Sequence, residues 1–280
     1  MNTALIVAVS AVGLVVGGLV TIPADRVVGG EALSFRSRCG ACKARLAWSE
    51  TIPLVSWLVL RGRCRHCLVR IGLMYPTIEL TTSALWVAAT LRFGWGWQLF
   101  PPLVLVVSLM ALSLVDLYSY RLPDRFVFSA LGLSSLVMVA GAIGSGDRRV
   151  LGYAVLGMCV YFSFLLVVHL ISPRGLGFGD VKFSLLLGLN LGWVTGSSNG
   201  DWVDVVRYVF WAQLLASLIG LVGGISISVL RRRLKRDVLP DPQAVADQPV
   251  RILAQSFPFG PALACATMTV VLLADSIPAF

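Results

Sequence analysis

Charged residues are scarce in this chain of 280 residues. They make up 13% of it, against roughly 25% in soluble domains. Apolar residues make up 57%, and the mean hydropathy is +0.85. A soluble core of this size does not need so much apolar sequence, and the excess lies in long runs. The composition therefore excludes an ordinary soluble domain and indicates an integral membrane protein.

Other missing features narrow the class of protein further. No Lys or Arg precedes the first apolar run, near residues 4–22. A signal peptide has a basic start, so we expect a retained first helix with its N-terminus outside. The glycine-rich strand–turn–helix fingerprint of a nucleotide-binding fold is missing. There is also no internal repeat or low-complexity tract.

Long apolar runs dominate what is present. Each is close to the ~20 residues that cross a bilayer as a helix. They predict an all-α polytopic membrane protein with about eight transmembrane helices, near residues 4–22, 76–93, 98–117, 125–145, 150–172, 181–196, 205–230 and 259–275. The second and sixth runs are the weakest, because Glu79 and Lys182 lie in their first turns.

The basic residues favour one side of these spans. With the N-terminus outside, nineteen of the 23 Lys and Arg residues fall on the inner side. The inner segments are 23–75, 118–125, 173–182 and 231–258. Cytoplasmic loops are enriched in Lys and Arg. We therefore expect a multi-pass protein of the cytoplasmic membrane, with these segments in the cytoplasm.

A run of basic residues, Arg231 to Arg236, opens the last inner segment. Nucleic-acid binding is one interpretation, but contact with lipid headgroups is the usual role of such a run. We expect the bilayer as partner and no nucleic acid. Three prolines in the rest of this segment predict a flexible loop.

Four of the six cysteines form two C-x-x-C pairs in segment 23–75, namely Cys39, Cys42, Cys64 and Cys67. Four thiolates in two close pairs suit tetrahedral zinc. Two disulfides are the alternative, which a reducing cytoplasm disfavours. A four-cysteine site leaves no open coordination position, so we expect structural zinc in a cytoplasmic loop. His66 as a replacement ligand is a lesser alternative.

Two aspartates stand where apolar spans meet the predicted cytoplasmic side. Asp116 closes the third span, and Asp180 follows Gly177 and Gly179 before the sixth. A carboxylate at membrane depth is costly and marks a functional site by default. If the two helices touch, one aspartate can hold a proton while the other activates water for peptide hydrolysis. The glycines would let irregular backbone approach a substrate strand closely.

Other roles stay open for these residues. Asp180 could cap the sixth helix, or the two aspartates could bind a divalent cation or relay protons in a transporter. Lys182 could pair with Asp180 or reach lipid phosphates. Pro123 and Asp124 fit N1 and the N-cap at the start of the fourth helix. We expect His169 to be a packed histidine.

Several motifs in order resemble the type IV prepilin leader peptidases, membrane aspartyl proteases of the GxGD type. The resemblance runs from about residue 17 to about residue 190. It rests on S-R-C-G-A-C at 37–42, I-P-L-V-S-W at 52–57, R-G-R-C-R-H-C at 61–67, Y-P-T-I-E at 75–79, V-D at 115–116 with L-P-D at 122–124, and G-F-G-D-V-K at 177–182. Together these motifs are far more specific than any one alone.

The resemblance implies that Asp116 and Asp180 form the catalytic pair, supported by Gly177, Gly179 and Lys182. The substrate would be a prepilin or pseudopilin precursor of a type IV pilus or type II secretion system. Cleavage would follow its short leader, on the cytoplasmic side of a bacterial inner membrane.

The resemblance also implies how the chain is divided. Residues 1–22 would form the first transmembrane helix and 23–75 the zinc-binding loop. The membrane peptidase core would be 76–230, followed by the basic loop 231–258 and the last helix in 259–280.

Full-length members of that family commonly also methylate the new N-terminus with S-adenosylmethionine. The resemblance places Arg26 and Glu79 in the region of that activity, within or next to segment 23–75. Thr21 stands where the family pattern has Asn. The local alternative for Glu79 is a carboxylate favoured by a helix N-terminus.

Two other functions remain under consideration. One is a GxGD membrane protease that acts on other substrates, and the other is a zinc-stabilised membrane transporter or scaffold. A transporter should carry ionisable residues near the bilayer midplane. Here the carboxylates lie near one surface, which favours an enzyme.

Overall fold

The computed structural model describes residues 3–28, 39, 41–119, 122–173, 175–234 and 259–276, with the backbone alone at 22–28, 48, 119, 230–234 and 275. The side chains of Arg26 and of Arg231 to Arg233 lie outside the described residues, as do residues 235–258, which hold the end of the basic run and the proline-containing loop.

Eight long helices make up most of the described chain, and each coincides with one predicted apolar span. They are α1 (Thr3–Val28), α3 (Met74–Phe93), α4 (Phe100–Ser119), α5 (Asp124–Ser145), α6 (Arg149–Ile171), α7 (Phe178–Ser197), α8 (Trp202–Leu234) and α9 (Gly260–Leu273). Short helical turns accompany them, η1 (Trp48–Glu50), α2 (Val55–Val59), η2 (Trp97–Leu99) and η3 (Ala274–Ser276). The described residues form no β-strand beyond an isolated bridge between Arg63 and Arg70. The all-α prediction is confirmed.

Five of these helices, α1, α4, α5, α6 and α8, are long and apolar enough to cross a membrane. By length and composition, five of the described helices therefore qualify as transmembrane helices, fewer than the eight expected. At 14 residues, α9 is about 21 Å long, less than the ~30 Å hydrocarbon core. The polar residues of α3 and α7 lower the hydropathy of these two helices. In α7 every residue from Leu186 to Gly196 is buried, so it needs no lipid-facing surface.

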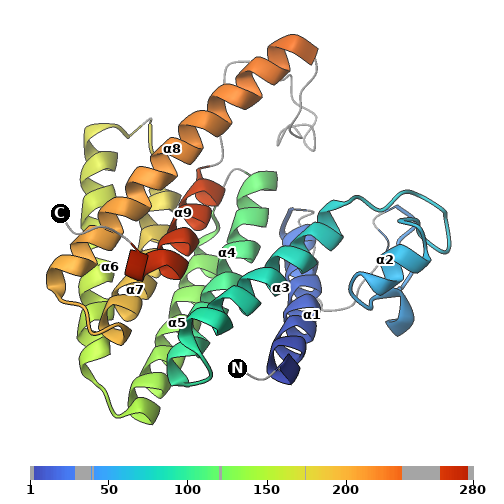
Figure 1. The fold of residues 1–280 in the computed structure, drawn as a ribbon. Helices are drawn as coiled ribbons and strands as arrows, with labels where there is room; N and C mark the ends of the chain where they lie inside the picture. Colours follow the sequence, from blue (N-terminus) through green and yellow to red (C-terminus); the bar gives the residue numbers. More distant parts are fainter. Residues whose placement is uncertain are drawn as a thin grey trace.

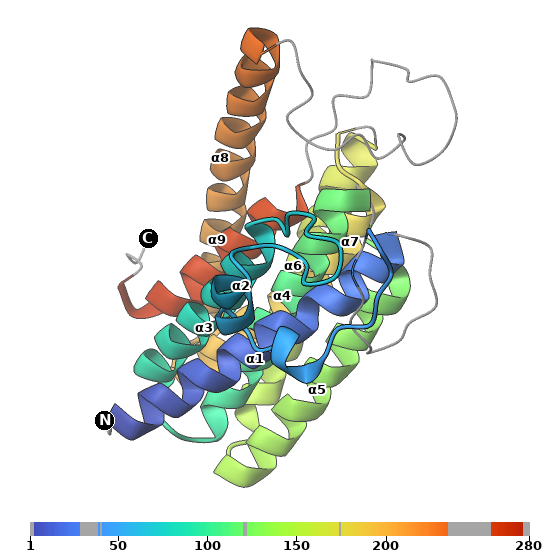
Figure 2. The same ribbon diagram turned by 90° about the vertical axis from the view of Figure 1, so that its right-hand side faces the viewer.

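Consecutive helices from α4 to α8 run in alternating directions, because short connections join them (Figure 1). The ends of α4 and α6 and the starts of α5, α7 and α9 therefore lie toward one end of the bundle, the upper end in Figure 1, and α8 extends beyond this end. The segment that contains α2 and the cysteines lies beside α1 and α3, on the outside of the bundle (Figure 2). Both predicted aspartates and the cysteines thus belong to segments joined at this end.

The closest helix contact joins α6 and α7, and glycines make it possible. A Cβ at Gly188 would collide with the carbonyl oxygen of Gly157, and a Cβ at Gly192 with that of Tyr153. Gly188, Gly192 and Gly196 recur every four residues along one face of α7. Small residues at this spacing let membrane helices approach backbone to backbone. This contact fixes the position of α7 in the bundle.

We predict that Gly192→Ala destabilises the protein, because the added methyl group meets backbone that cannot rotate away. Overpacking of this kind costs about 1–3 kcal/mol. The matched control is Gly152→Ala on α6, where a Cβ meets nothing within 4 Å. Thermal unfolding in detergent should show a lower midpoint for Gly192→Ala alone. Equal midpoints for the two variants would contradict the packing argument.

Candidate active site

Asp116 lies in the last turn of α4 and is almost completely buried, with 6% of its surface exposed. Its Oδ2 atom accepts a hydrogen bond from the backbone N–H of Gly260 at 3.0 Å. Gly260 is the first residue of α9, so this carboxylate joins two helices that are far apart in sequence. The sequence interpretation missed Gly260. The only local signal is the Gly260–Pro261 pair at the start of the last apolar run.

Asp180 lies in the first turn of α7, three residues after the N-cap Gly177. Its Oδ2 lies beside Gly177, 3.4 Å from the position of an added Cβ, and the backbone N–H of Gly177 interacts with the carboxylate, which matches the position of the carboxylate in a capping box. The charge of Asp116 acts on this carboxylate, and α4 packs directly against α7. The structure therefore places the two predicted aspartates within electrostatic reach of each other, and the N-cap position considered as an alternative for Asp180 is held by Gly177.

The glycines before Asp180 differ from the expectation of irregular backbone. α7 already begins at Phe178, so Gly179 is helical, and Gly177 is an ordinary extended N-cap with φ −67° and ψ 144°. The reason for glycine at 179 is space, because a Cβ there would lie 3.3 Å from Cβ of Leu122. The connection between α4 and α5 thus packs onto the first turn of α7.

Lys182 pairs with a different aspartate from the one expected. Its Nζ donates to both carboxylate oxygens of Asp124 at 2.7 Å, and it lies 5.0 Å above the ring of Phe178. The expected pairing of Lys182 with Asp180 or with lipid phosphates is therefore wrong. Lys182 instead forms an ion pair that connects α7 to α5. Pro123 is the N-cap of α5 and Asp124 its first residue, the reverse of the expected assignment.

His169 provides a second contact that holds the start of α7. Its Nδ1 is 2.8 Å from the carbonyl oxygen of Leu176, to which it donates a hydrogen bond as Nδ1–H. Its ring packs against Phe178 with centroids 5.5 Å apart. The prediction of a packed histidine is confirmed.

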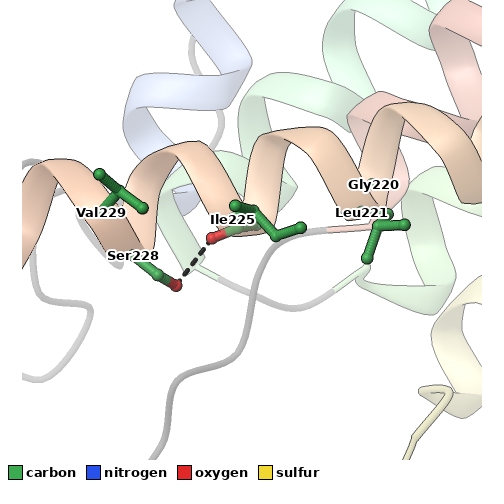
Figure 3. A pocket seen from close by; sticks show the side chains of 6 residues that line it. Gly220, Leu221, Ile225, Ser228 and Val229 are labelled. Carbon is green, nitrogen blue, oxygen red and sulfur yellow. Dashed lines mark hydrogen bonds between the residues drawn. The ribbon is translucent and has the colours of Figure 1, made fainter.

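A groove of about 420 Å³ runs along the face of α8 (Figure 3). It is lined by Gly220, Leu221, Gly224, Ile225, Ser228 and Val229. Gly220 also leaves room for the ring of Phe259, since a Cβ there would lie 2.9 Å from Cε2 of that ring. Phe259 directly precedes Gly260. The groove therefore begins beside the residue that leads into the contact with Asp116.

The two C-x-x-C segments fold into matching turns. The backbone N–H of Cys39 donates to the carbonyl of Ala44, and that of Lys43 returns to the carbonyl of Cys39. The backbone bonds Cys64 to Val69 and Leu68 to Cys64 repeat this pattern at the same spacing. Lys43 and Leu68 share a positive φ, 58° and 57°. Two equivalent turns present their thiols toward each other.

The four Sγ atoms lie within 4.8 Å of one another, and those of Cys39 and Cys67 are 3.8 Å apart. A tetrahedral site with Zn–S bonds of about 2.3 Å requires S···S separations of about 3.8 Å. None of these cysteines forms a disulfide in the described structure. His66 is about half exposed beside Glu50 and stands apart from this cluster. The geometry fits a four-cysteine zinc site.

The pKa values of the thiols also favour a bound zinc ion. The backbone N–H of Cys42 donates to Cys39 and lowers the pKa of Cys39 to about 6. At Cys67 the backbone N–H of Val69 acts in the lowering direction, but desolvation and the neighbouring thiols outweigh it and raise the pKa to about 11. Four thiols this close do not all ionise without a positive charge between them. A divalent metal supplies that charge.

Glu79 attaches the cysteine segment to the membrane helices. Its Oε2 accepts the backbone N–H of Leu54 at 2.8 Å, where Leu54 has the strained φ of +57°. Its Oε1 faces Gly18 of α1, 3.3 Å from the position of an added Cβ. Pro53 lies against the same glycine, 3.6 Å from that position. This carboxylate therefore joins α3, α1 and the segment before α2.

Glu79 and Thr21, which lie in the region that the resemblance associates with methylation, both have hydrogen-bond partners within the protein. Glu79 is already engaged by Leu54, and the side chain of Arg26 lies outside the described residues. Thr21 is 5% exposed, and its hydroxyl donates to the carbonyl of Gly18 within its own helix at 2.8 Å.

Comparison with known proteins places the chain in a family. The model of the bacterial peptidase A24 N-terminal domain matches residues 11–93, and that of the type IV leader peptidase family matches residues 103–225. A prepilin leader peptidase/N-methyltransferase of Bacillus subtilis (strain 168) is 30% identical over 88% of this chain and 84% of its own length. The chain belongs to the type IV leader peptidase family. The predicted resemblance is confirmed, and the chain is a membrane protease.

Further relatives carry the same name. The protein of Aeromonas hydrophila is 34% identical over 86% of this chain and 73% of its own length. That of Myxococcus xanthus (strain DK1622) is 36% identical over 76% of this chain and 60% of its own length. No solved structure matches the chain. In this leader peptidase the N-terminal family model covers α1, the cysteine segment and α3, and the second model begins in α4 and ends in α8.

Removal of one thiol should empty the cysteine site. We predict that Cys39→Ser lowers bound zinc from about one ion per chain and lowers the yield of folded protein, because three thiolates hold the metal less tightly. Cys159→Ser on α6 is the control, since that cysteine is exposed and far along the chain from the cluster. Metal analysis by plasma mass spectrometry measures the content. Full zinc and unchanged stability in Cys39→Ser would refute the structural-metal assignment.

The ion pair between α5 and α7 should be measurable as a coupling. Lys182→Met and Asp124→Asn should each lower the free energy of unfolding. The double variant should lower it by less than the sum of the two single decreases. Because Asp124 is 57% exposed, we expect a coupling of about 0.5–1 kcal/mol. The exposed pair Arg149–Asp147 at the other end of the bundle is the control and should couple more weakly. Additive effects at Lys182 and Asp124 would show that the pair does not join the helices energetically.

Proposed function

We propose that this leader peptidase removes the leader peptide of prepilin or pseudopilin precursors, with Asp116 and Asp180 as the catalytic pair. The observation that supports the proposal is that the charge of Asp116 acts on Asp180 across the contact of α4 with α7, with a backbone N–H beside each carboxylate. The names of the relatives support the substrate class.

The chemistry follows from the proximity of two carboxylates. Two such groups do not both ionise cheaply, so one holds a proton. The ionised aspartate takes a proton from a water molecule, whose oxygen attacks the scissile carbonyl carbon. The protonated aspartate gives its proton to the carbonyl oxygen. Collapse of the tetrahedral species breaks the C–N bond. The proton held by the first aspartate passes to the leaving nitrogen, and one hydroxyl proton of the tetrahedral species returns to the second aspartate.

The same proposal places cleavage at the cytoplasmic face of a bacterial inner membrane. Nineteen of the 23 Lys and Arg residues belong to segments on the side of the aspartates, and cytoplasmic loops favour such residues. The remaining four, Arg92, Arg148, Arg149 and Arg207, belong to the opposite helix ends. A precursor whose leader lies in the cytoplasm would meet the two carboxylates where its hydrophobic helix enters the membrane.

A second activity is N-methylation of the new terminal residue with S-adenosylmethionine. It is supported by the names of the relatives and by the match of the N-terminal family model to residues 11–93. The four-cysteine segment lies within that match. In this proposal zinc keeps that segment folded and takes no part in peptide hydrolysis.

Substitution of either aspartate should abolish cleavage. We predict that Asp116→Asn and Asp180→Asn each lower the rate of leader removal by about 10²–10⁴-fold or more, because each removes one proton-transfer group. The variants should still insert and fold. The control is Asp147→Asn, a partly exposed residue between α5 and α6, which should retain wild-type activity. Cleavage of prepilins in membranes is followed by mass spectrometry of the product.

The outcomes separate the candidate functions. Leader loss in wild type and the control alone supports the aspartyl peptidase, and a product heavier by one CH₂ unit when S-adenosylmethionine is added supports methylation. Cleavage of other membrane proteins but no prepilin would favour a protease with other substrates. If wild type and both aspartate variants behave alike across several prepilins, the transporter or scaffold alternative gains support.

A further inference from the structure

We propose that the first turn of α9 belongs to the peptidase site, with Gly260 as a positioning residue for Asp116. This inference rests on the proposed function and deepens it. It assigns a role to the last helix, which the aspartates alone do not require. It also explains why residue 260 is a glycine.

The space around Gly260 is occupied by Asp116. An added Cβ would lie 2.6 Å from Oδ2, 3.2 Å from Cγ and 3.4 Å from Cβ of Asp116, and these are its three nearest neighbours outside its own helix. Contacts below 3.0 Å force one group to move. Because Oδ2 is the free end of a side chain, the carboxylate rather than the helix backbone would yield. A side chain at 260 would therefore displace the reacting group more than the fold.

The close approach of Gly260 to Asp116 allows a hydrogen bond between them. Gly260 N–H donates to Oδ2 of Asp116, so one carboxylate oxygen is fixed and the other is left for water or substrate. The donor is available because the first N–H groups of a helix have no partner within the helix. Pro261, the next residue, has no N–H to compete for the same oxygen. Asp180 is held within its own helix, whereas the orientation of Asp116 depends on α9.

Phe259 fixes the place where α9 begins. It is the N-cap residue of α9, and its carbonyl accepts the backbone N–H of Leu263 at 3.1 Å. Its ring lies against α8 at Gly220, where an added Cβ would be 2.9 Å from Cε2 and 3.1 Å from Cδ2. A substitution at Gly220 would push this ring and, through it, the first turn of α9. The position of Asp116 is thus set from α8 through α9.

The first test is kinetic. Gly260→Ala should lower kcat for prepilin cleavage at least tenfold and change KM less than twofold, because substrate binding does not involve the displaced carboxylate oxygen. Gly220→Ala should lower kcat by a smaller factor, since it acts one residue further away. Gly132→Ala on α5, where a Cβ meets nothing within 4 Å, is the control and should cleave like wild type. Wild-type kcat in Gly260→Ala would overturn the proposal.

The second test separates positioning from a general need for glycine. Thermal unfolding is measured for Gly260→Ala in the wild-type and Asp116→Ala backgrounds. Because the two closest clashing atoms are absent in Asp116→Ala, the shift in midpoint caused by Gly260→Ala should fall by at least half there. An equal shift in both backgrounds would overturn the contact. This measurement needs no substrate, so it stands even if wild type cleaves no prepilin, in which case the proposed function fails on its own.

Discussion

The burial of α7 on every side is the constraint on which the site depends. α6 approaches it backbone to backbone through glycines, and α4, α5, α8 and α9 pack on its other faces. A helix enclosed in this way gains little from apolar side chains facing lipid, which is why it tolerates Asn190 and a row of glycines. Its first turn carries Asp180. The position of that carboxylate is therefore determined by contacts made along the whole length of the helix.

The second carboxylate is fixed by a different principle. Asp116 lies at the C-terminal end of α4, where no free N–H of its own helix is available. The donor has to come from another element, and the structure supplies it from α9. Lys182 with Asp124 and His169 with Leu176 hold the neighbouring helix ends in place. Two carboxylates that repel each other are thus kept together by backbone donors and by contacts outside the pair.

The sequence predicted the helices and both aspartates because these signals are local. Apolar runs of about 20 residues predict helices in any membrane protein, and the G-F-G-D-V-K motif stands out without knowledge of its neighbours. The partner of Lys182 was wrong, since the ion pair joins residues 58 positions apart. Gly260 was missed because its role depends on Asp116, 144 positions away. The weak apolarity of α7 and the shortness of α9 likewise become understandable only once their burial is known.

The attachment of the cysteine segment affects how changes of sequence and length in this segment act on the rest of the chain. The segment reaches the membrane helices through Glu79, Leu54 and Gly18, whereas the aspartates are held by α4 to α9. The two family models divide between residues 93 and 103, around the turn at Gly94 with its positive φ of 67°. A change in length among the cysteines acts first on α1 and α3, and reaches Asp116 through the contacts of these two helices with α4. The architecture allows its two parts to vary at different rates.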